Sequence, residues 1–207
     1  MFRLYCRKGA GSMAVEALLA VVGAPCEVID LERKPDGSFH DFFLKINPKA
    51  EVPTLVLPDD SVMTESAAMM IHIADSFPAA GLAPALGDAQ RPQFLRWLVY
   101  MAASLYSSDL RMFYPERFTT TPAECAGIKA RAIAMMGHEF AIYADALGSK
   151  PFILGERMSA ADIYAAMLCT WAPDLGELFA RHPNLKAMYE RVTAVPAIRQ
   201  VWARNEA

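Results

Sequence analysis

The sequence predicts an α/β amino-terminal half followed by an all-helical carboxy-terminal half. Short apolar runs alternate with helical patterns over the first 76 residues, whereas only helical patterns follow the segment 77–88, which is rich in proline and glycine. A chain of 207 residues is long enough for two small domains, each with its own core. We therefore expect an α/β domain over residues 1–78, a linker over 79–88 and a helical domain over 89–207.

The first elements form a βαβ pattern. Residues 2–6 begin with alternating apolar and polar side chains and predict a strand. The turn Gly9–Gly11 follows, and Ser12 begins a helical pattern that Gly23 stops. Residues 26–31 predict a second strand. Since connections of this kind are right-handed crossovers, we expect the two strands to be parallel.

The rest of this half predicts a short helix, a hairpin and a final helix. Residues 39–46 form a short helical pattern that ends before Pro48, and residues 52–64 predict a hairpin around Pro58–Ser61. A helix follows from about residue 66 to residue 76. The resulting order, βαβαββα, is that of a thioredoxin-like domain.

The second half contains only helical patterns. Ser159 and Asp162 form a capping box before an apolar run, which predicts a folding role for this pair, because the box satisfies otherwise unpaired N–H groups. The expected helices cover residues 89–106, 123–147, 159–169, 173–180 and 185–192, with a short one after Pro196.

Composition excludes several classes of protein. A net charge of −3 gives no reason to expect a nucleic-acid partner. No apolar run approaches the roughly 20 residues of a membrane span, and the first twelve residues turn polar too soon for a signal peptide. We therefore expect a cytoplasmic protein that has neither nucleic acid nor a membrane as a partner.

Cysteine and histidine spacing argues against a metal site. The four cysteines and four histidines are scattered, without the spacing of zinc ligands or of a disulfide framework. Free cysteines are usually buried and reduced in such proteins. We expect no metal cofactor.

Residues 47–75 are the most informative part of the chain. An apolar run containing Val52 and Pro53 is followed by a turn, a second short run and then Glu65 and Ser66 at a helix start. The N–H groups of the helix and the Ser66 hydroxyl favour an anion, and Glu65 favours a cation. A ligand with an ammonium and a carboxylate on one carbon fits this pair, and the γ-glutamyl end of glutathione is such a group.

The pair Val52–Pro53 followed by Glu65–Ser66 resembles the glutathione-binding signature of the cytosolic glutathione S-transferase family. The resemblance extends over nearly the whole chain and is closest to bacterial, beta- or theta-like members. It implies a cis bond before Pro53, which turns the main chain of Val52 toward the cysteinyl part of glutathione like an added strand. A trans proline at a strand start is the alternative.

A transferase of this kind needs the thiolate of glutathione, because the thiol is mostly protonated at neutral pH. Ser12 is the first candidate for the group that stabilises the sulfur anion, although it also suits a helix cap. Tyr5 is the second candidate, with packing as its more ordinary role, and Cys6 is the third. The beta-type members have a cysteine one place before this serine, where Gly11 stands here. The resemblance therefore favours serine-assisted conjugation over cysteine-based thiol transfer.

Two further groups are expected at the site: a cation for the glycyl carboxylate of glutathione and a pocket for the electrophile. Lys34, Lys49 and His40 are candidate partners of the glycyl carboxylate, and the sequence does not rank them. In the family, the region after residue 100 lines the pocket for an apolar electrophile. The aromatic and arginine side chains there suit a planar, electron-poor substrate, although helix packing explains the aromatic residues equally well. The candidate pocket residues are Tyr106, Arg111, Phe113 and Tyr114.

The resemblance implies an enzyme, a glutathione transferase in which the glutathione thiolate attacks a small apolar electrophile. It also implies a homodimer and a role in detoxification, with glutathione as the co-substrate. Two alternatives stay open: a glutathione-dependent peroxidase, thiol reductase or isomerase, and a non-catalytic binding module of the same fold.

Overall fold

The computed structural model of the chain describes residues 1–206 and divides them into two compact units. Unit 1 consists of residues 1–83 and 193–206, and unit 2 consists of residues 84–192. The first unit contains a sheet with helices, and the second contains helices only. An α/β half followed by a helical half is the order that the sequence predicts.

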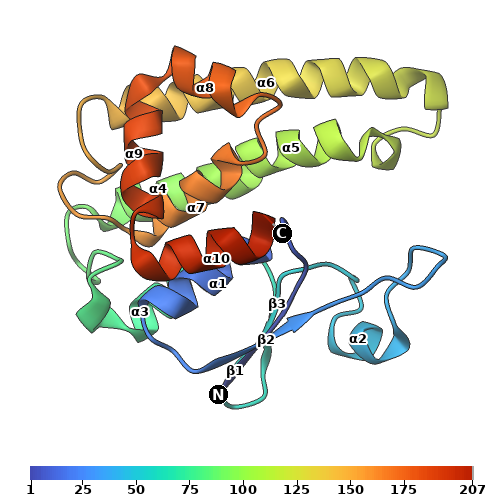
Figure 1. Cartoon of the computed structure of the whole chain (residues 1–207), viewed down its shortest axis with the longest axis horizontal. Helices are drawn as coiled ribbons and strands as arrows, with labels where there is room; N and C mark the ends of the chain where they lie inside the picture. Colours follow the sequence, from blue (N-terminus) through green and yellow to red (C-terminus); the bar gives the residue numbers. More distant parts are fainter. Residues whose placement is uncertain (207) are drawn as a thin grey trace. The chain divides into compact units, whose positions relative to one another are not determined.

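Unit 1 contains the predicted βαβαββα order (Figure 1). Its elements are β1 (Phe2–Cys6), α1 (Ser12–Val21), β2 (Cys26–Asp30), α2 (Asp41–Ile46), β3 (Thr54–Val56), β4 (Val62–Met63), α3 (Ser66–Ser76), the 3-10 turn η1 (Pro78–Ala80) and α10 (Pro196–Glu206).

The four strands form one mixed sheet in the order β2-β1-β3-β4. β1 and β2 are parallel, with Leu4 opposite Val28, as the crossover rule predicts. β3 runs antiparallel to β1, with Tyr5 opposite Thr54, and antiparallel to β4, with Leu55 opposite Met63. The predicted thioredoxin-like domain is therefore confirmed.

Helices and strands both supply the core of unit 1, and Leu4 of β1 and Leu55 of β3 are fully buried. Residues 12–19 of α1 are all buried, and α1 packs against both α3 and α10. Along β1, alternate side chains point to opposite faces of the sheet. Tyr5 accordingly belongs to a separate cluster with Phe43 of α2, together with Leu31, Phe39 and Val56.

Helix α10 belongs to unit 1, although it follows the helical half in the sequence. Figure 1 shows it lying beside α1, and contacts between α1 and α10 are among the most extensive in the unit. The predicted helical domain, residues 89–207, included this segment. The contacts place its described residues with the sheet, because α10 buries Ile198, Val201 and Trp202.

Unit 2 is all-helical, as predicted. Its elements are α4 (Arg91–Tyr100), the π-helical segment η2 (Met101–Leu105), α5 (Tyr106–Phe113), the 3-10 turns η3 (Pro115–Arg117) and η4 (Pro122–Glu124), α6 (Cys125–Leu147), α7 (Ala160–Cys169), α8 (Leu175–Arg181) and α9 (Pro183–Thr193).

Two predictions about unit 2 have clear outcomes. The predicted helix end at Tyr106 is wrong, because the helix continues through η2 and α5 to Phe113, where the following Pro115 stops it. The capping box is confirmed: Asp162 Oδ2 accepts from the Ser159 N–H at 2.8 Å and from the Ser159 hydroxyl at 2.7 Å. Asp162 Oδ1 also accepts from the Ile153 N–H at 2.8 Å. Burial raises the pKa of Asp162 to about 6.

Within residues 1–206 no helix combines the length and the apolar character needed to cross a membrane.

Two acidic residues of unit 2, Asp109 and Glu139, are buried with a carboxylate oxygen that has no hydrogen-bond partner among the described residues. Asp109 on α5 is 5% exposed, and its Oδ1 has no hydrogen-bond partner among the described residues. Loss of hydration disfavours the charged form. Burial therefore raises the pKa of Asp109 to about 7, from an ordinary value of 3.8.

Asp109 should make the stability of the fold depend on pH. Between pH 4 and pH 7 the folded state binds this proton more tightly than the unfolded state, so the free energy of unfolding falls as pH rises from about 4 to about 7 and levels off above that. At about 1.4 kcal/mol for each pKa unit, the cost at pH 8 is on the order of a few kcal/mol. Thermal unfolding of wild type and Asp109→Asn measures this at pH 5 and pH 8. The variant should lose less stability than wild type when the pH is raised from 5 to 8.

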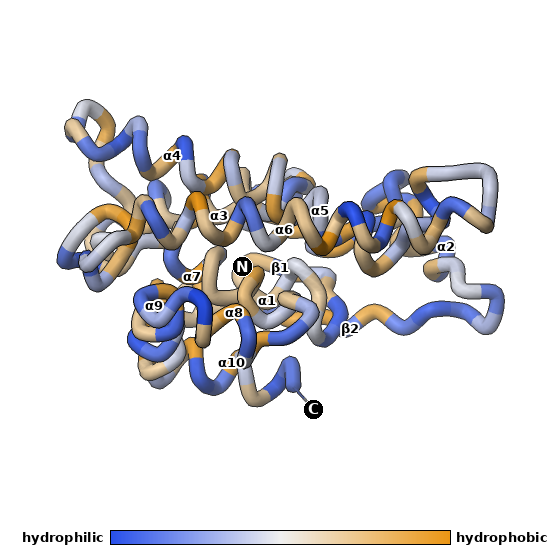
Figure 2. The backbone as a smooth tube through the Cα atoms, turned by 90° about the horizontal axis from the view of Figure 1, so that it is seen from above, coloured by the Kyte–Doolittle hydropathy of each residue, from blue (hydrophilic) through white to orange (hydrophobic). Residues whose placement is uncertain are grey.

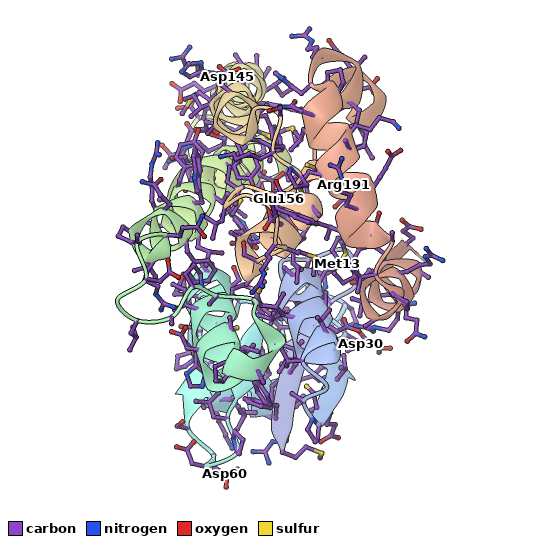
Figure 3. The ribbon with its side chains drawn as sticks, turned by 90° about the vertical axis from the view of Figure 1, so that its left-hand side faces the viewer. Met13, Asp30, Asp60, Asp145, Glu156 and Arg191 are labelled. Atoms are coloured by element: carbon purple, nitrogen blue, oxygen red, sulfur yellow. The ribbon has the colours of Figure 1, made fainter. Side chains whose placement is uncertain are left out.

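The matched control is Asp145→Asn, which removes an exposed carboxylate from the same unit (Figure 3). This control should keep the pH dependence of the wild type. Equal pH dependence in wild type and Asp109→Asn would show that Asp109 carries no such cost.

Candidate functional site

Three chain segments meet at one edge of the sheet of unit 1. Since β1 and β4 both run antiparallel to β3, their carboxyl ends lie at the edge where β3 begins. The turn after Cys6, the segment before Thr54 and the residues after Met63 therefore share this edge. In Figure 3, Met13 and Asp60 mark opposite ends of unit 1, with the β3–β4 turn far from the start of α1.

Two helices begin at the same edge. α1 follows β1 and α3 follows β4, and the two helices pack against each other. The first N–H groups of a helix lack partners within the helix and carry a partial positive charge. With two such helix starts side by side, the edge favours an anionic ligand.

The Val52–Pro53 peptide bond at this edge is cis, as expected. A network of hydrogen bonds holds the segment that precedes it. The buried Asn47 donates from Nδ2 to the Glu51 carbonyl and to Thr54 Oγ1, both at 2.9 Å. Thr54 Oγ1 also donates to the Glu51 carbonyl. Val52 itself is half-buried against the Tyr5 cluster.

Glu65 and Ser66 lie at the start of α3, on the same edge. Glu65 has φ 65° and ψ 100°, a left-handed conformation that is uncommon for residues with a side chain. Conformations of this kind cost roughly 1–3 kcal/mol and concentrate at functional sites. Glu65 is exposed, whereas Ser66 is the first residue of the helix and is buried to 9% exposure.

Lys49 lies beside Glu65. Its Nζ is 2.9 Å from Glu51 Oε2 and 3.5 Å from Glu65 Oε1, and the hydrogen bond to Glu51 raises the pKa of Lys49. All three side chains are largely exposed, so these ion pairs contribute little to stability. Lys49 is therefore a charge at the Glu65 end of the site.

Ser12 is the first residue of α1, and Gly11 occupies the cap position. The Ser12 hydroxyl donates to the Arg7 carbonyl at 3.2 Å and accepts from the Arg7 N–H at 3.4 Å. Ser12 is 1% exposed, and its only hydroxyl hydrogen is used in the bond to the Arg7 carbonyl. The hydroxyl would therefore have to break this bond before it could donate to a sulfur atom.

Tyr5 and Cys6 are both packed into unit 1. The Tyr5 ring lies 5.6 Å from the ring of Phe43, which is the packing role that the sequence favoured. The Cys6 thiol donates to Asp30 Oδ1 at 3.2 Å and is 0% exposed. Burial, and then the bond to Asp30, raise the pKa of Cys6 to about 12.

Lys34 and His40 lie on the segment between β2 and α2, which is largely hydrophilic in Figure 2. Lys34 Nζ donates to Asp41 Oδ1 at 2.7 Å, and this bond raises the pKa of Lys34. The exposed His40 precedes α2 and stacks on Phe42, with 6.2 Å between the ring centres.

The four candidate pocket residues lie in unit 2, on or beside α5. Tyr106 packs edge-on against Trp171, with 5.1 Å between the ring centres. Arg111 donates to the Ser107 carbonyl at 2.8 Å, and its guanidinium lies 4.6 Å from the Phe118 ring centre. Phe113 and Tyr114 are exposed.

The described residues hold no group of three or more histidine, cysteine, aspartate or glutamate side chains able to bind a metal ion.

Comparison with known proteins identifies the family. Residues 12–76 match the family described as glutathione S-transferase, N-terminal domain, and residues 109–196 match glutathione S-transferase, C-terminal domain. A GST-like protein of Escherichia coli K12, YncG, is 30% identical and covers the whole of this chain and 99% of its own length. The chain belongs to the glutathione S-transferase family. The prediction of a glutathione transferase is thus confirmed at the level of the family.

Two further relatives of this transferase are informative. Glutathione S-transferase GstA of Escherichia coli O157:H7 is 30% identical over 82% of each chain. A solved structure from Sulfitobacter, a glutathione transferase homologue with bound glutathione, is 25% identical, with a TM-score of 0.87 over 100% of this chain and 99% of the other. One of these two relatives is named a glutathione S-transferase, and the other is a structure that contains bound glutathione.

Sequence reasoning missed several residues around the predicted site of this transferase. Asn47 and Thr54 hold the segment before Pro53, and Asn205 of α10 accepts from the Gly9 N–H at 3.1 Å. The Asn47-Pro48 pair is a turn signal that could have pointed to Asn47. No local pattern connects Asn205 with Gly9, because 196 positions separate them.

Cys6 should be unreactive in the folded transferase. A buried thiol whose pKa lies near 12 has almost no thiolate at pH 8, so we expect iodoacetamide to leave Cys6 unmodified. Peptide mass spectrometry measures this, with the half-buried Cys125 as an internal comparison and urea-unfolded protein as the control for intrinsic reactivity. Rapid alkylation of Cys6 in the folded protein would restore it as a candidate nucleophile.

Proposed function

We propose that this transferase binds glutathione across the edge of the sheet in unit 1 and catalyses attack of its thiolate on a small apolar electrophile. The observation that carries the proposal is the convergence of Val52–Pro53, Glu65–Ser66 and the start of α1 at that one edge. Family membership supports glutathione as the ligand, since a related structure contains it.

Glu65 and Ser66 are the proposed anchors of the γ-glutamyl end. Its carboxylate accepts from Ser66 and the first N–H groups of α3, and its ammonium pairs with Glu65. Lys49 already lies 3.5 Å from Glu65 and must share this carboxylate with the ammonium of the ligand. The main chain of Val52 pairs with the cysteinyl unit beside the cis bond.

Lys34 is the proposed partner of the glycyl carboxylate. Among the three candidate cations, Lys49 is paired with two carboxylates, Glu51 and Glu65, whereas Lys34 is paired with the single carboxylate of Asp41. His40 is placed on the same segment and is the second choice.

The proposed thiolate partner is the start of α1. The Ser12 hydroxyl turns from the Arg7 carbonyl to the sulfur, and the first N–H groups of α1 add their partial positive charge. The sulfur then attacks the electrophilic carbon, a C–S bond forms, and the leaving group departs with its electron pair. Tyr106, Arg111, Phe113 and Tyr114 are the proposed contacts of a planar electrophile.

The family resemblance also supports a cytoplasmic homodimer with a role in detoxification.

Activity is tested with glutathione and 1-chloro-2,4-dinitrobenzene, whose conjugation releases chloride and produces an absorbing thioether. Calorimetry with glutathione provides the separate measurement of binding. Binding with conjugation supports the transferase, whereas binding without turnover of this or other electrophiles supports the non-catalytic module. Reduction of a peroxide or a disulfide in place of conjugation supports the other enzyme alternative.

Glu65→Gln should weaken glutathione binding by roughly 10- to 100-fold, because a hydrogen bond to a charged group is worth about 1.5–3 kcal/mol. The melting temperature should change little, since Glu65 is exposed. Glu51→Gln is the matched control, because Glu51 is also an exposed carboxylate paired with Lys49. Titration calorimetry measures both, and equal losses in the two variants would remove the special role of Glu65.

Ser12→Ala should raise the pKa of bound glutathione by about one unit, the effect of one hydrogen bond to the thiolate. Ultraviolet absorbance of the thiolate at a series of pH values measures the shift. Since the Ser12 hydroxyl also bonds to the main chain of Arg7, we expect the variant to have a lower melting temperature as well. A lower melting temperature with an unchanged thiol pKa would restrict Ser12 to holding the turn.

A further inference from the structure

The carboxy-terminal helix α10 is joined to the start of α1 by a network of charged and polar groups. Arg204 forms a two-pronged ion pair with Glu16 of α1, with Nε 2.7 Å from Oε1. The third nitrogen of the same guanidinium, Nη1, is 2.7 Å from Asp30 Oδ2 at the end of β2. Glu16 is only 8% exposed in its side chain, so the Arg204 pair is shielded from water on one side. These bonds fix the last turn of α10 against α1.

The next residue, Asn205, is in contact with the turn between β1 and α1. Its side-chain oxygen accepts from the Gly9 N–H at 3.1 Å. Its Nδ2 donates to the Val201 carbonyl at 2.8 Å and to Glu16 Oε2 at 3.4 Å. At 9% exposure, Asn205 has its amide oriented by α10 itself and by the Glu16 carboxylate. The Gly9 N–H therefore meets an acceptor whose position is fixed.

The turn is held from its other end as well. The Ser12 hydroxyl bonds to both main-chain groups of Arg7, and the Ala10 N–H donates to the Arg7 carbonyl at 3.2 Å. Gly9, at φ 67°, is in the left-handed region, where glycine is favoured. The positions of Arg7 and Gly9 together determine the direction in which the Ser12 hydroxyl and the first N–H groups of α1 point.

We propose that Asn205 is a positioning residue for the thiolate of glutathione. It acts through the Gly9 N–H on the turn that presents Ser12 and the start of α1 to the sulfur. This inference rests on the proposed function, which places the thiolate at that turn. It assigns to the last turn of α10 a part in the chemistry of unit 1.

Asn205 acts on the ionisation of the thiol and not on the binding of the rest of glutathione. The proposed anchors of the γ-glutamyl end, Glu65 and Ser66, lie at the start of α3 and have no hydrogen bond to Asn205 in the network described above. Loss of the Asn205 amide should therefore change the ionisation of the thiol while leaving the affinity for the rest of the tripeptide nearly unchanged.

The experiment compares Asn205→Ala with wild type by two titrations. Thiolate absorbance against pH gives the pKa of bound glutathione, which should rise by about half a unit to one unit in the variant. Calorimetry with S-methylglutathione, which has no ionisable thiol, should give an affinity within about twofold of wild type. Hydrogen exchange of the Gly9 amide should become faster, because the hydrogen bond to the Asn205 side-chain oxygen has been removed.

Asn184→Ala is the matched control. Asn184 donates from Nδ2 to the carbonyls of Ala144 and Gly148 at 2.7 Å and 3.0 Å, all within unit 2. It should lower the melting temperature and leave the thiol pKa unchanged. If truncation of Asn205 prevents folding, Asn205→Leu retains much of the volume while it lacks the acceptor, and the same pKa shift is expected.

An unchanged thiol pKa in the folded Asn205 variant overturns the inference, and so does an equal shift in Asn184→Ala. Failure of the proposed function has a different signature. In that case the wild-type protein itself neither binds S-methylglutathione nor produces thiolate absorbance with glutathione.

Discussion

The direction of β3 between β1 and β4 is the constraint on which the site depends. Because β3 is antiparallel to both neighbours, β1 and β4 end at the same edge of the sheet, and the helices that follow them begin there. A parallel β3 would require a long crossover connection in place of the short turn at residues 58–61, and it would carry the segment before Thr54 to the opposite edge. The short hairpin therefore brings the two helix starts and the Val52–Pro53 bond together.

The electrostatics of this edge follow from the backbone more than from the side chains. Two helix starts contribute partial positive charge that no substitution of a side chain removes. The ion pairs of Lys49 and Lys34 are exposed, and such pairs are worth little and are screened by salt. The left-handed Glu65 is different, because its backbone conformation costs free energy at the residue that precedes Ser66.

The network of α10 illustrates how a remote segment gains influence over the same edge. Arg204 bonds to Glu16 of α1 and Asp30 of β2, two carboxylates on separate elements, and Asn205 bonds to the turn between β1 and α1. A guanidinium with several donors in one plane suits this role better than an ammonium would. The described end of the chain thus contributes to the amino-terminal unit, although 188 positions separate Glu16 from Arg204.

The sequence by itself determined the order of elements and the anchor pair. Periodicity identified β1, α1, β2 and α3 nearly to the residue, because each is bounded by glycine, proline or a polar turn. The resemblance carried by Val52–Pro53 and Glu65–Ser66 supplied the cis bond and the family. The end of the long helix after Tyr106 was missed, since no residue before Pro115 breaks a helix and the π-helical segment has no sequence signal.

Only the tertiary structure decided how individual side chains are used. It showed that the Ser12 hydroxyl bonds to Arg7, that Cys6 is buried beside Asp30, and that Lys49 stands next to Glu65. It also showed that α10 belongs to the first unit and that Asn205 bonds to Gly9. Periodicity indicates which face of a helix is apolar. These contacts depend instead on the path of the whole chain, which no local sequence pattern predicts.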